Sequence, residues 1–247
     1  MNVSTIRNRL LQVLPSNDLG PLLPHLERVD VHKGEVLIQQ GQPLEHAYFP
    51  EGGLSSNLAV TSDGRKIEVG CFGFEGMVST AAVLGSDRAS HEILVQVGAP
   101  WLRLPTEVLK QAIQASPTLK AVLLRYVQIQ ILTFSHSALA NGAFVMRERL
   151  ARWLLMAHDR LEGDNLALTH EFLSLMLGVQ RSGLTLAIQE LEGLSIIRAR
   201  RGLLTVLDRD KLREMAGDSY GFPEAEYERL IGPFRGEMTS HLSPVGG

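Results

Sequence analysis

The stretch that most constrains the fold is 168–197, LTHEFLSLMLGVQRSGLTLAIQELEGLSII, whose apolar positions fit two short helices joined by a tight turn. The first helix would begin after Thr169, because a threonine hydroxyl accepts hydrogen bonds from the free amides of a helix N-terminus. Gly178 supplies the turn, since glycine tolerates positive φ. The second helix would span about 180–191 and bury Leu184, Ile188 and Leu191. This pattern predicts a helix-turn-helix.

The outer face of the second helix predicts contacts with DNA, because in such motifs this helix enters the major groove. We expect contacts with DNA from Thr169, Gln180, Arg181, Ser182, Thr185 and Gln189. The fork of an arginine matches the two acceptors of guanine. Arg181 has no acidic residue three or four positions away, so we expect its guanidinium to be free in the unbound protein.

The residues that follow predict a wing, which is a β-hairpin beside the helix-turn-helix. A strand begins at 196–197, residues 200–202 form a turn, and 203–207 form the second strand. Arg198, Arg200 and Arg201 lie near its tip, where cations meet phosphate. Between 147 and 221 the chain has eleven Lys plus Arg and eleven Asp plus Glu, so binding depends on where the arginines point. An ordinary helical hairpin with a solvated basic turn is the alternative.

Ahead of this segment, short apolar runs alternate with glycine-bearing turns over about 29–104, which is typical of a β-sandwich or barrel. The clearest strands are 35–38, 54–60, 66–69 and 93–97. Amphipathic helices are predicted at 6–14 and at about 105–115. We therefore expect residues 1–116 to form a β-roll domain with an N-terminal helix.

A long helix is predicted over 117–142, and its apolar residues, including Leu123 and Ile129, lie nearly all round it. Such a helix needs two surfaces to bury it. One would be its own β-roll, and the other the same helix of a second copy in a coiled coil, with Leu123 and Ile129 in the dimer seam. Burial in a monomer is the alternative. We expect a hinge at Asn141-Gly142, a DNA-binding domain over 143–222 and a flexible tail over 223–247.

Composition limits the other classes of function. The chain has 247 residues and a net charge of −3, and its start lacks the layout of a signal peptide. Without an apolar run that could span a bilayer, we expect a cytoplasmic protein with no membrane partner. A lone cysteine, Cys71, allows no internal disulfide and is expected to be buried. No His-x-His pair and no nucleophile-elbow or phosphate-loop pattern occurs, so we predict no metal site and no enzyme.

The order of parts resembles the family of the cyclic-AMP receptor protein and the fumarate-nitrate regulator, known as Crp/Fnr. The resemblance covers about 22–220 and is carried by LTHEFLSLMLGVQRSGLTLAIQELEGLSIIRARRG, KGEVLIQQGQP and EVGCFGFEGMVS. It implies an α+β fold with an N-terminal β jelly-roll of the cyclic-nucleotide-binding type, a long dimerisation helix and a C-terminal winged helix-turn-helix. It also implies a homodimeric transcription regulator that reads a roughly palindromic operator in double-stranded DNA and contacts RNA polymerase.

By position, Arg181 matches the guanine-reading arginine of this family. Ser182 and Gly183 stand where well-known members carry Glu and Thr, and Leu186 replaces a second arginine. The operator is therefore expected to differ from that of the cyclic-AMP receptor. A protein-interaction module with a degenerate sensor, or a jelly-roll enzyme, are the alternative functions.

Members that bind cyclic AMP hold its phosphate with a short cassette of Gly-Glu followed, about ten residues on, by Arg-Ser or Arg-Ala. The candidate effector residues here are Gly73, Glu75, Gly76, Arg88 and Ala89. Glu75 and Gly76 are transposed, and Arg88-Ala89 is a few residues out of register. A cyclic nucleotide is thus a candidate whose cassette is not matched, and the sequence identifies no cofactor.

Overall fold

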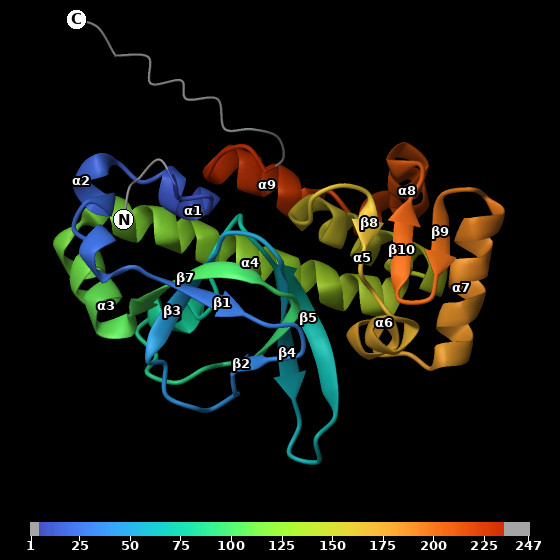
Figure 1. Ribbon diagram of the computed structural model, residues 1–247, viewed down its shortest axis with the longest axis horizontal. Helices are drawn as coiled ribbons and strands as arrows, with labels where there is room; N and C mark the ends of the chain where they lie inside the picture. The colour runs from blue at the N-terminus through green and yellow to red at the C-terminus, as the bar shows by residue number, and fades with distance from the viewer. Residues whose placement is uncertain (1–4, 235–247) are drawn as a thin grey trace, which may run out of the picture.

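The long helix α4 (Pro117–Ala143) connects two parts of the chain (Figure 1). The computed structural model describes residues 5–234. A β-rich N-terminal domain packs on one side of α4, and a mainly helical C-terminal domain lies at its far end. Ser116 caps α4 by accepting a hydrogen bond from the Leu119 amide, and Pro117 at the first position needs no amide partner.

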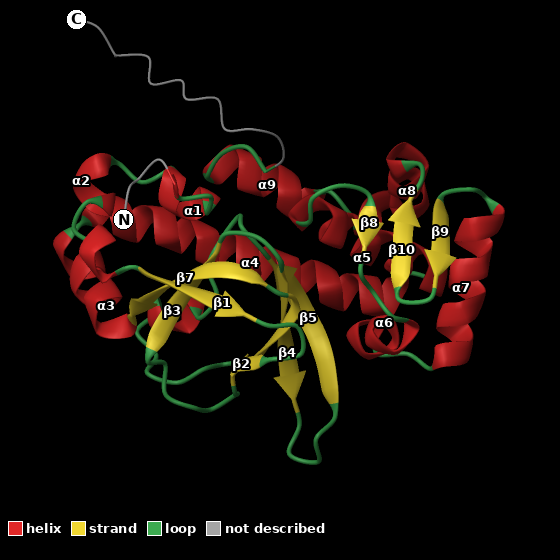
Figure 2. Cartoon of the chain, viewed as in Figure 1, coloured by secondary structure: helices red, strands yellow, loops and turns green. Residues whose placement is uncertain are grey.

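The N-terminal domain is a roll of two antiparallel sheets (Figure 2). One sheet has the order β1-β7-β3 and the other β2-β6-β4-β5. The strands are β1 (Glu27–Val31), β2 (Val36–Ile38), β3 (His46–Pro50), β4 (Leu54–Val60), β5 (Lys66–Phe72), β6 (Glu92–Val97) and β7 (Ala99–Pro105). The four predicted strands coincide with β2, β4, β5 and β6, which confirms the expected β-rich roll. Cys71 is buried on β5, as predicted.

The N-terminal domain also contains three helices: α1 (Arg9–Gln12), α2 (Ser16–Leu19) and α3 (Thr106–Ala115). The first helix is shorter than predicted, because the segment before it is held by tertiary contacts. The buried Asn8 side chain caps α1 at the Leu11 amide and donates to the carbonyls of Pro50 and Gly76. These three bonds hold residue 8 in an extended conformation at the helix N-cap.

The packing of α4 contradicts the prediction that Leu123 and Ile129 lie in a dimer seam. Leu123 and Ile129 are 1% and 5% exposed within one chain, because they pack into the core of its own roll. Three other apolar residues of α4 point outward: Leu124, Ile131 and Leu139. The predicted hinge at Asn141-Gly142 lies in the last turn of α4, and the extended residues Phe144 and Val145 separate α4 from the next helix.

The C-terminal domain contains the predicted helix-turn-helix and wing. Its elements are α5 (Met146–Arg160), β8 (Asn165–Leu166), α6 (His170–Leu177), α7 (Arg181–Gly193), β9 (Ile197–Arg200), β10 (Leu203–Val206) and α8 (Arg209–Ala216). The strands form a sheet with the order β8-β10-β9. The core extends into the roll, because Leu54 and Leu58 of β4 and Cys71 of β5 pack with the C-terminal domain.

The prediction of a flexible tail over 223–247 is wrong for its first part. Residues Phe222–Leu230 form helix α9, which lies along α4 (Figure 1). Tyr227 and Phe234 are buried against each other and against the roll. The segment is polar in composition, and two aromatic anchors are enough to hold it. The rest of the predicted tail, 235–247, lies outside the described residues.

Candidate functional site

The turn between α6 and α7 has the local geometry that a helix-turn-helix requires. The Thr169 hydroxyl accepts a hydrogen bond of 3.2 Å from the Phe172 amide, which fixes the start of α6. Gly178 adopts φ of 63°, where a side chain would be strained. On α7, Leu184, Ile188 and Leu191 are buried, as predicted. The orientation of α7 is therefore set by its apolar face.

The opposite face of α7 exposes most of the polar residues expected there. Gln180, Arg181, Ser182 and Gln189 are exposed and Thr185 is half-buried. The Thr185 hydroxyl donates a 2.8 Å hydrogen bond to the Arg181 carbonyl, which satisfies its hydrogen within the helix. Its oxygen remains an acceptor for a ligand.

Arg181 is paired in the unbound protein, which corrects the expectation of a free guanidinium. Its Nη2 lies 3.0 Å from Oε1 of Glu171. Glu171 is ten positions earlier, so spacing along one helix could not reveal this contact, and the fold of the motif brings the two together. Both side chains are largely exposed, and such pairs contribute at most about 1 kcal/mol. A phosphate or a guanine could replace the carboxylate at small cost.

The wing is a β-hairpin, in which alternate residues of a strand project to the same side. Arg198 and Arg200 are exposed and flank the half-buried Ala199, so both project to the same side of β9. Arg201 and Gly202 form the turn, with φ of 74° at Gly202. The three arginines therefore lie at the end of the hairpin.

A surface groove brings α6, α7 and the wing together. Six of the nine predicted DNA-contacting residues line it: Thr169, Arg181, Thr185, Gln189, Arg200 and Arg201. Gln180, Ser182 and Arg198 lie outside its lining. Glu171 and Glu192 also line the groove. Since Glu171 holds Arg181 and Glu192 accepts from the Ala199 amide, both carboxylates already have partners.

The two domains also meet through a buried carboxyl group that the sequence analysis missed. Glu68 on β5 accepts a 2.7 Å hydrogen bond from the Trp153 indole on α5 and a 3.1 Å bond from the Gln96 amide. Ser56 donates to the same carboxyl group, and Met176 of α6 closes the cluster. Burial raises the pKa of Glu68 to about 7. A charged residue within the buried strand 66–72 was the signal that could have marked it.

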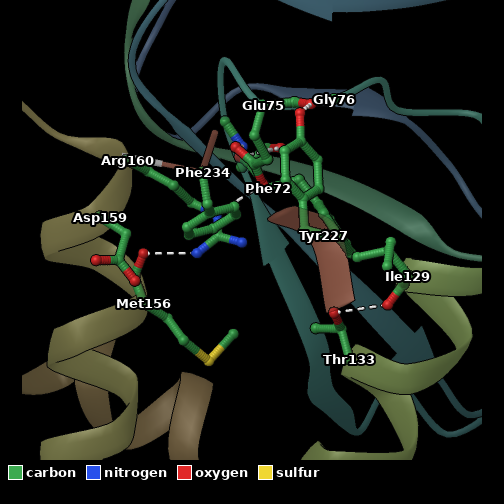
Figure 3. Close-up of polar contacts among 12 residues, drawn as sticks. Phe72, Glu75, Gly76, Ile129, Thr133, Met156, Asp159, Arg160, Tyr227 and Phe234 are labelled. Carbon is green, nitrogen blue, oxygen red and sulfur yellow. Dashed lines mark hydrogen bonds and ion pairs between the residues drawn. The ribbon is translucent and has the colours of Figure 1, made fainter. Parts of the chain in front are cut away.

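A second buried contact between the domains joins Arg160 of α5 to Glu75 (Figure 3). The guanidinium Nε lies 2.8 Å from Oε1, and both side chains are almost fully buried. Burial alone would lower the pKa of Arg160, but the Glu75 carboxylate raises it. The Tyr227 hydroxyl donates to the Glu75 carbonyl at 2.6 Å, and the Phe234 ring stacks on Arg160. Helix α9 and Phe234, which follows it, therefore cover this ion pair.

The candidate effector residues lie in two separate places, at this ion pair and on the surface of the roll. Glu75 is occupied by Arg160, and its second oxygen accepts from the Gly73 amide. A Cβ at Gly76 would overlap the Tyr126 hydroxyl, so only glycine fits there. Arg88 is exposed and donates to the Gly41 carbonyl. Of the five residues, Ala89 alone lines the cavity between the roll and α4.

That cavity does not fit a cyclic nucleotide. None of the described residues that line it is an arginine or a lysine, so its walls provide no cation for a phosphate. A volume of about 130 Å³ is also below the roughly 300 Å³ at which cavities for larger ligands begin. The two parts of the expected cassette, near Glu75 and near Arg88, face other partners.

Two further properties of residues 5–234 bear on the class of protein. None of their helices is long and apolar enough to cross a membrane. The same residues contain no group of three or more His, Cys, Asp or Glu side chains placed to hold a metal ion.

Comparison with solved structures supports the fold. FixK2 from Bradyrhizobium japonicum superposes with a TM-score of 0.67 at 16% identity, covering 78% of this chain and 98% of that one. The c-di-GMP-responsive global regulator CLP of Xanthomonas campestris gives 0.62 at 18%, covering 78% and 99%. A Crp/Fnr-family transcriptional regulator from Thermus thermophilus gives 0.62 at 22%, covering 77% and 98%. Comparison with curated protein sequences gives no match.

Family profiles match both domains, in the order in which the structure has them. The cyclic nucleotide-binding domain profile matches residues 28–116, and the Crp-like helix-turn-helix domain profile matches residues 148–215. Together they cover more than half of the chain. With both domains and the long helix between them, the chain belongs to the Crp/Fnr family of transcriptional regulators and is a DNA-binding regulator of transcription.

Proposed function

We propose that this regulator acts as a homodimer that reads a roughly palindromic operator with two copies of α7. The observation that carries the proposal is the groove in which Arg181 and Gln189 of α7 lie beside Arg200 and Arg201 of the wing. This arrangement combines base-reading side chains with phosphate-binding cations on one surface. A two-fold axis would place two such surfaces about 34–36 Å apart, one helical turn of DNA.

The dimer contact follows from the outer face of α4. Leu124, Ile131 and Leu139 are 41%, 50% and 47% exposed, so α4 leaves several large apolar side chains uncovered in one chain. The face is continuous at coiled-coil spacing, with apolar, small or uncharged residues at seven positions: Ala121, Leu124, Gln128, Ile131, Ser135, Ala138 and Gly142. Small residues at four of these positions would let two helices approach closely.

The proposed contacts with DNA divide by chemistry. Arg181 pairs with a guanine in each half-site, and Gln180, Ser182, Thr185 and Gln189 meet neighbouring base edges. Phosphates are met by Thr169 and by the wing residues Arg198, Arg200 and Arg201. Since Glu171 holds Arg181 in the unbound protein, DNA binding exchanges one partner of this guanidinium for another.

Control of the DNA-binding domain would pass through the roll. The Trp153–Glu68 hydrogen bond and the Arg160–Glu75 ion pair fix α5 against β5 and the turn that follows it. A change in the packing of the roll on α4 would therefore alter the separation of the two recognition helices. As a regulator of transcription, the protein would act in the cytoplasm and contact RNA polymerase, without catalysing a reaction itself.

The test is to select DNA fragments from a random pool with the purified full-length protein and to sequence them. We expect an enriched inverted repeat whose half-sites are centred about one helical turn apart. Binding to a random duplex should be weaker and should fall steeply with salt. Lack of enrichment combined with salt-independent binding would contradict the proposal and favour a protein-interaction module.

A further inference from the structure

Leu186 is an apolar residue that the recognition helix α7 leaves uncovered. It is 62% exposed, whereas Leu184, Ile188 and Leu191 on the same helix are buried. Within Arg181–Gly193, all of which the structure describes, it is the one large apolar residue that is exposed. Contact between water and a leucine side chain is unfavourable in proportion to the apolar area, so a partner that covers Leu186 would bind more tightly.

Helical periodicity places Leu186 on the side of α7 that faces away from the core. Successive residues of an α-helix are about 100° apart, so the buried leucines lie along one side and Leu186 lies opposite them. Ser182 is four positions earlier and Gln189 three positions later, which puts both on the same face as Leu186. Both are exposed. Leu186 therefore lies between two polar residues that are proposed to contact bases.

The neighbours of Leu186 leave its side chain accessible. Side chains on a helix lean toward the N-terminus, so Leu186 lies over the turn that contains Ser182 and Gly183. Gly183 has no side chain, and a Cβ there would meet no nearby atom among residues 5–234. Toward the C-terminus, Oε2 of Glu190 lies 3.7 Å from Nη1 of Arg147 on α5. The leucine thus projects from the N-terminal half of α7, the part of such a helix that enters the major groove.

The major groove contains one methyl group that a leucine can contact favourably. Adenine, guanine and cytosine present hydrogen-bond donors and acceptors there, whereas thymine also presents its C5-methyl group. A leucine forms no hydrogen bond, so a polar base edge covered by Leu186 would lose water without gaining a partner. The side chain therefore favours thymine over the other three bases.

We propose that Leu186 determines specificity for a thymine in each half-site of the operator, through contact with its C5-methyl group. The inference rests on the proposed function and adds to it a base that no hydrogen-bonding side chain of α7 has to identify. Burial of one methyl group corresponds to about fourfold in affinity. The two half-sites of a dimer therefore correspond to roughly 15-fold together.

The first experiment uses the operator that full-length protein enriches from the random pool. Deoxyuridine replaces each thymidine in turn, symmetrically in both half-sites, which removes a methyl group and keeps the base pair. Affinities are measured at one fixed salt concentration, because binding to phosphates depends on salt. At the position that Leu186 contacts, the symmetric replacement should weaken binding of the wild type about 15-fold.

The second experiment repeats these titrations with Leu186→Ala. This variant should bind the thymidine operator at least 15-fold more weakly, at roughly fourfold or more per half-site. It should also be insensitive, within about twofold, to deoxyuridine at the position where the wild type is sensitive. Leu84→Ala is the matched control, because it changes a leucine of the roll that is 64% exposed. The control should keep both the affinity and the deoxyuridine sensitivity of the wild type.

Two results would overturn the proposal. If Leu186→Ala weakens binding to the operator and to a random duplex equally, the side chain contacts the sugar-phosphate backbone. If the deoxyuridine sensitivity of the variant matches that of the wild type at every position, Leu186 contacts no thymine methyl group. Failure of the proposed function is distinguishable from both, because the random pool would then yield no operator, which contradicts the reading of DNA by α7 as a whole.

Discussion

The indole nitrogen of Trp153, on the first helix of the DNA-binding domain, donates a 2.7 Å hydrogen bond to the buried carboxyl group of Glu68 in the roll. Gln96 and Ser56 also donate to this carboxyl group, and both contact the sulfur of Met176 as well. Along the chain, the two domains are connected through α4. Together with the Arg160–Glu75 ion pair, this contact therefore links the two domains directly.

Stability should depend on pH through Glu68. Burial raises its pKa from 4.5 to about 7, although Ser56, Trp153, Arg152 and Arg160 act to lower it. Between these pH values the folded chain keeps a proton that the unfolded chain has released. The stabilising contribution is present below about pH 4.5 and is lost as the pH rises to about 7.

The measurement is the free energy of unfolding of wild type and Glu68→Gln from pH 4.5 to pH 8. The difference, wild type minus variant, should fall by roughly 3 kcal/mol over this range. Glutamine keeps the oxygen that accepts from Trp153 and has no proton to lose. The variant is therefore the non-titrating reference for the wild type. A pH-independent difference would show that Glu68 titrates normally.

Replacement of Arg181 by alanine should cost roughly 1–3 kcal/mol per half-site on selected DNA and relax the preference at one base pair. Binding to a random duplex should change little. Glu171→Gln is the matched variant, because it removes the competing partner, and binding to selected DNA should strengthen by up to about fivefold per half-site. Equal losses on both DNAs with Arg181→Ala would make this residue a phosphate contact instead.

The double variant Arg200→Ala with Arg201→Ala should weaken binding to all sequences alike, because phosphate contacts carry little sequence information. The slope of affinity against salt should become shallower by about 1 for each phosphate that the variant no longer neutralises. Titrations at three or more salt concentrations on selected and random duplexes decide this. An unchanged dependence of affinity on salt would show that the arginines of the wing turn are solvated and do not contact phosphates.

The outer face of α4 should hold the dimer together. Leu124→Glu with Ile131→Glu would place charges in the seam, and sedimentation velocity should then show monomers at micromolar concentration. Leu186→Glu is the control, since it exchanges an exposed leucine on α7, and its dimer should persist. A wild-type protein that sediments as a monomer would argue against both the seam and the palindromic operator.

Removal of the aromatic anchor of α9 should destabilise the protein. Tyr227 is fully buried and bonded to the Glu75 carbonyl, so Tyr227→Ala should cost about 3–5 kcal/mol in denaturant unfolding. Phe222→Ala, at an exposed position of the same helix, should cost less than about 1 kcal/mol. Similar small losses for both would mean that α9 contributes little to stability.

Local patterns were enough to predict the helix-turn-helix, the wing, the roll and the long helix. In each case neighbouring residues carry the information: a capping threonine at 169, a turn glycine at 178, and apolar spacing at 184, 188 and 191. The resemblance of these motifs to one family also indicated the class of function that the domain comparisons support.

Contacts between distant segments were decided by the tertiary structure alone. Glu171 meets Arg181 because the motif folds them together, and Tyr227 reaches Glu75 across 152 positions. On α4, nearly all-round apolarity could not show which residues face the roll, because helical periodicity is lost when two faces are apolar. Sequence determines which residues can form helices, strands and turns locally, whereas the partner of a buried charge or aromatic ring depends on how those elements pack.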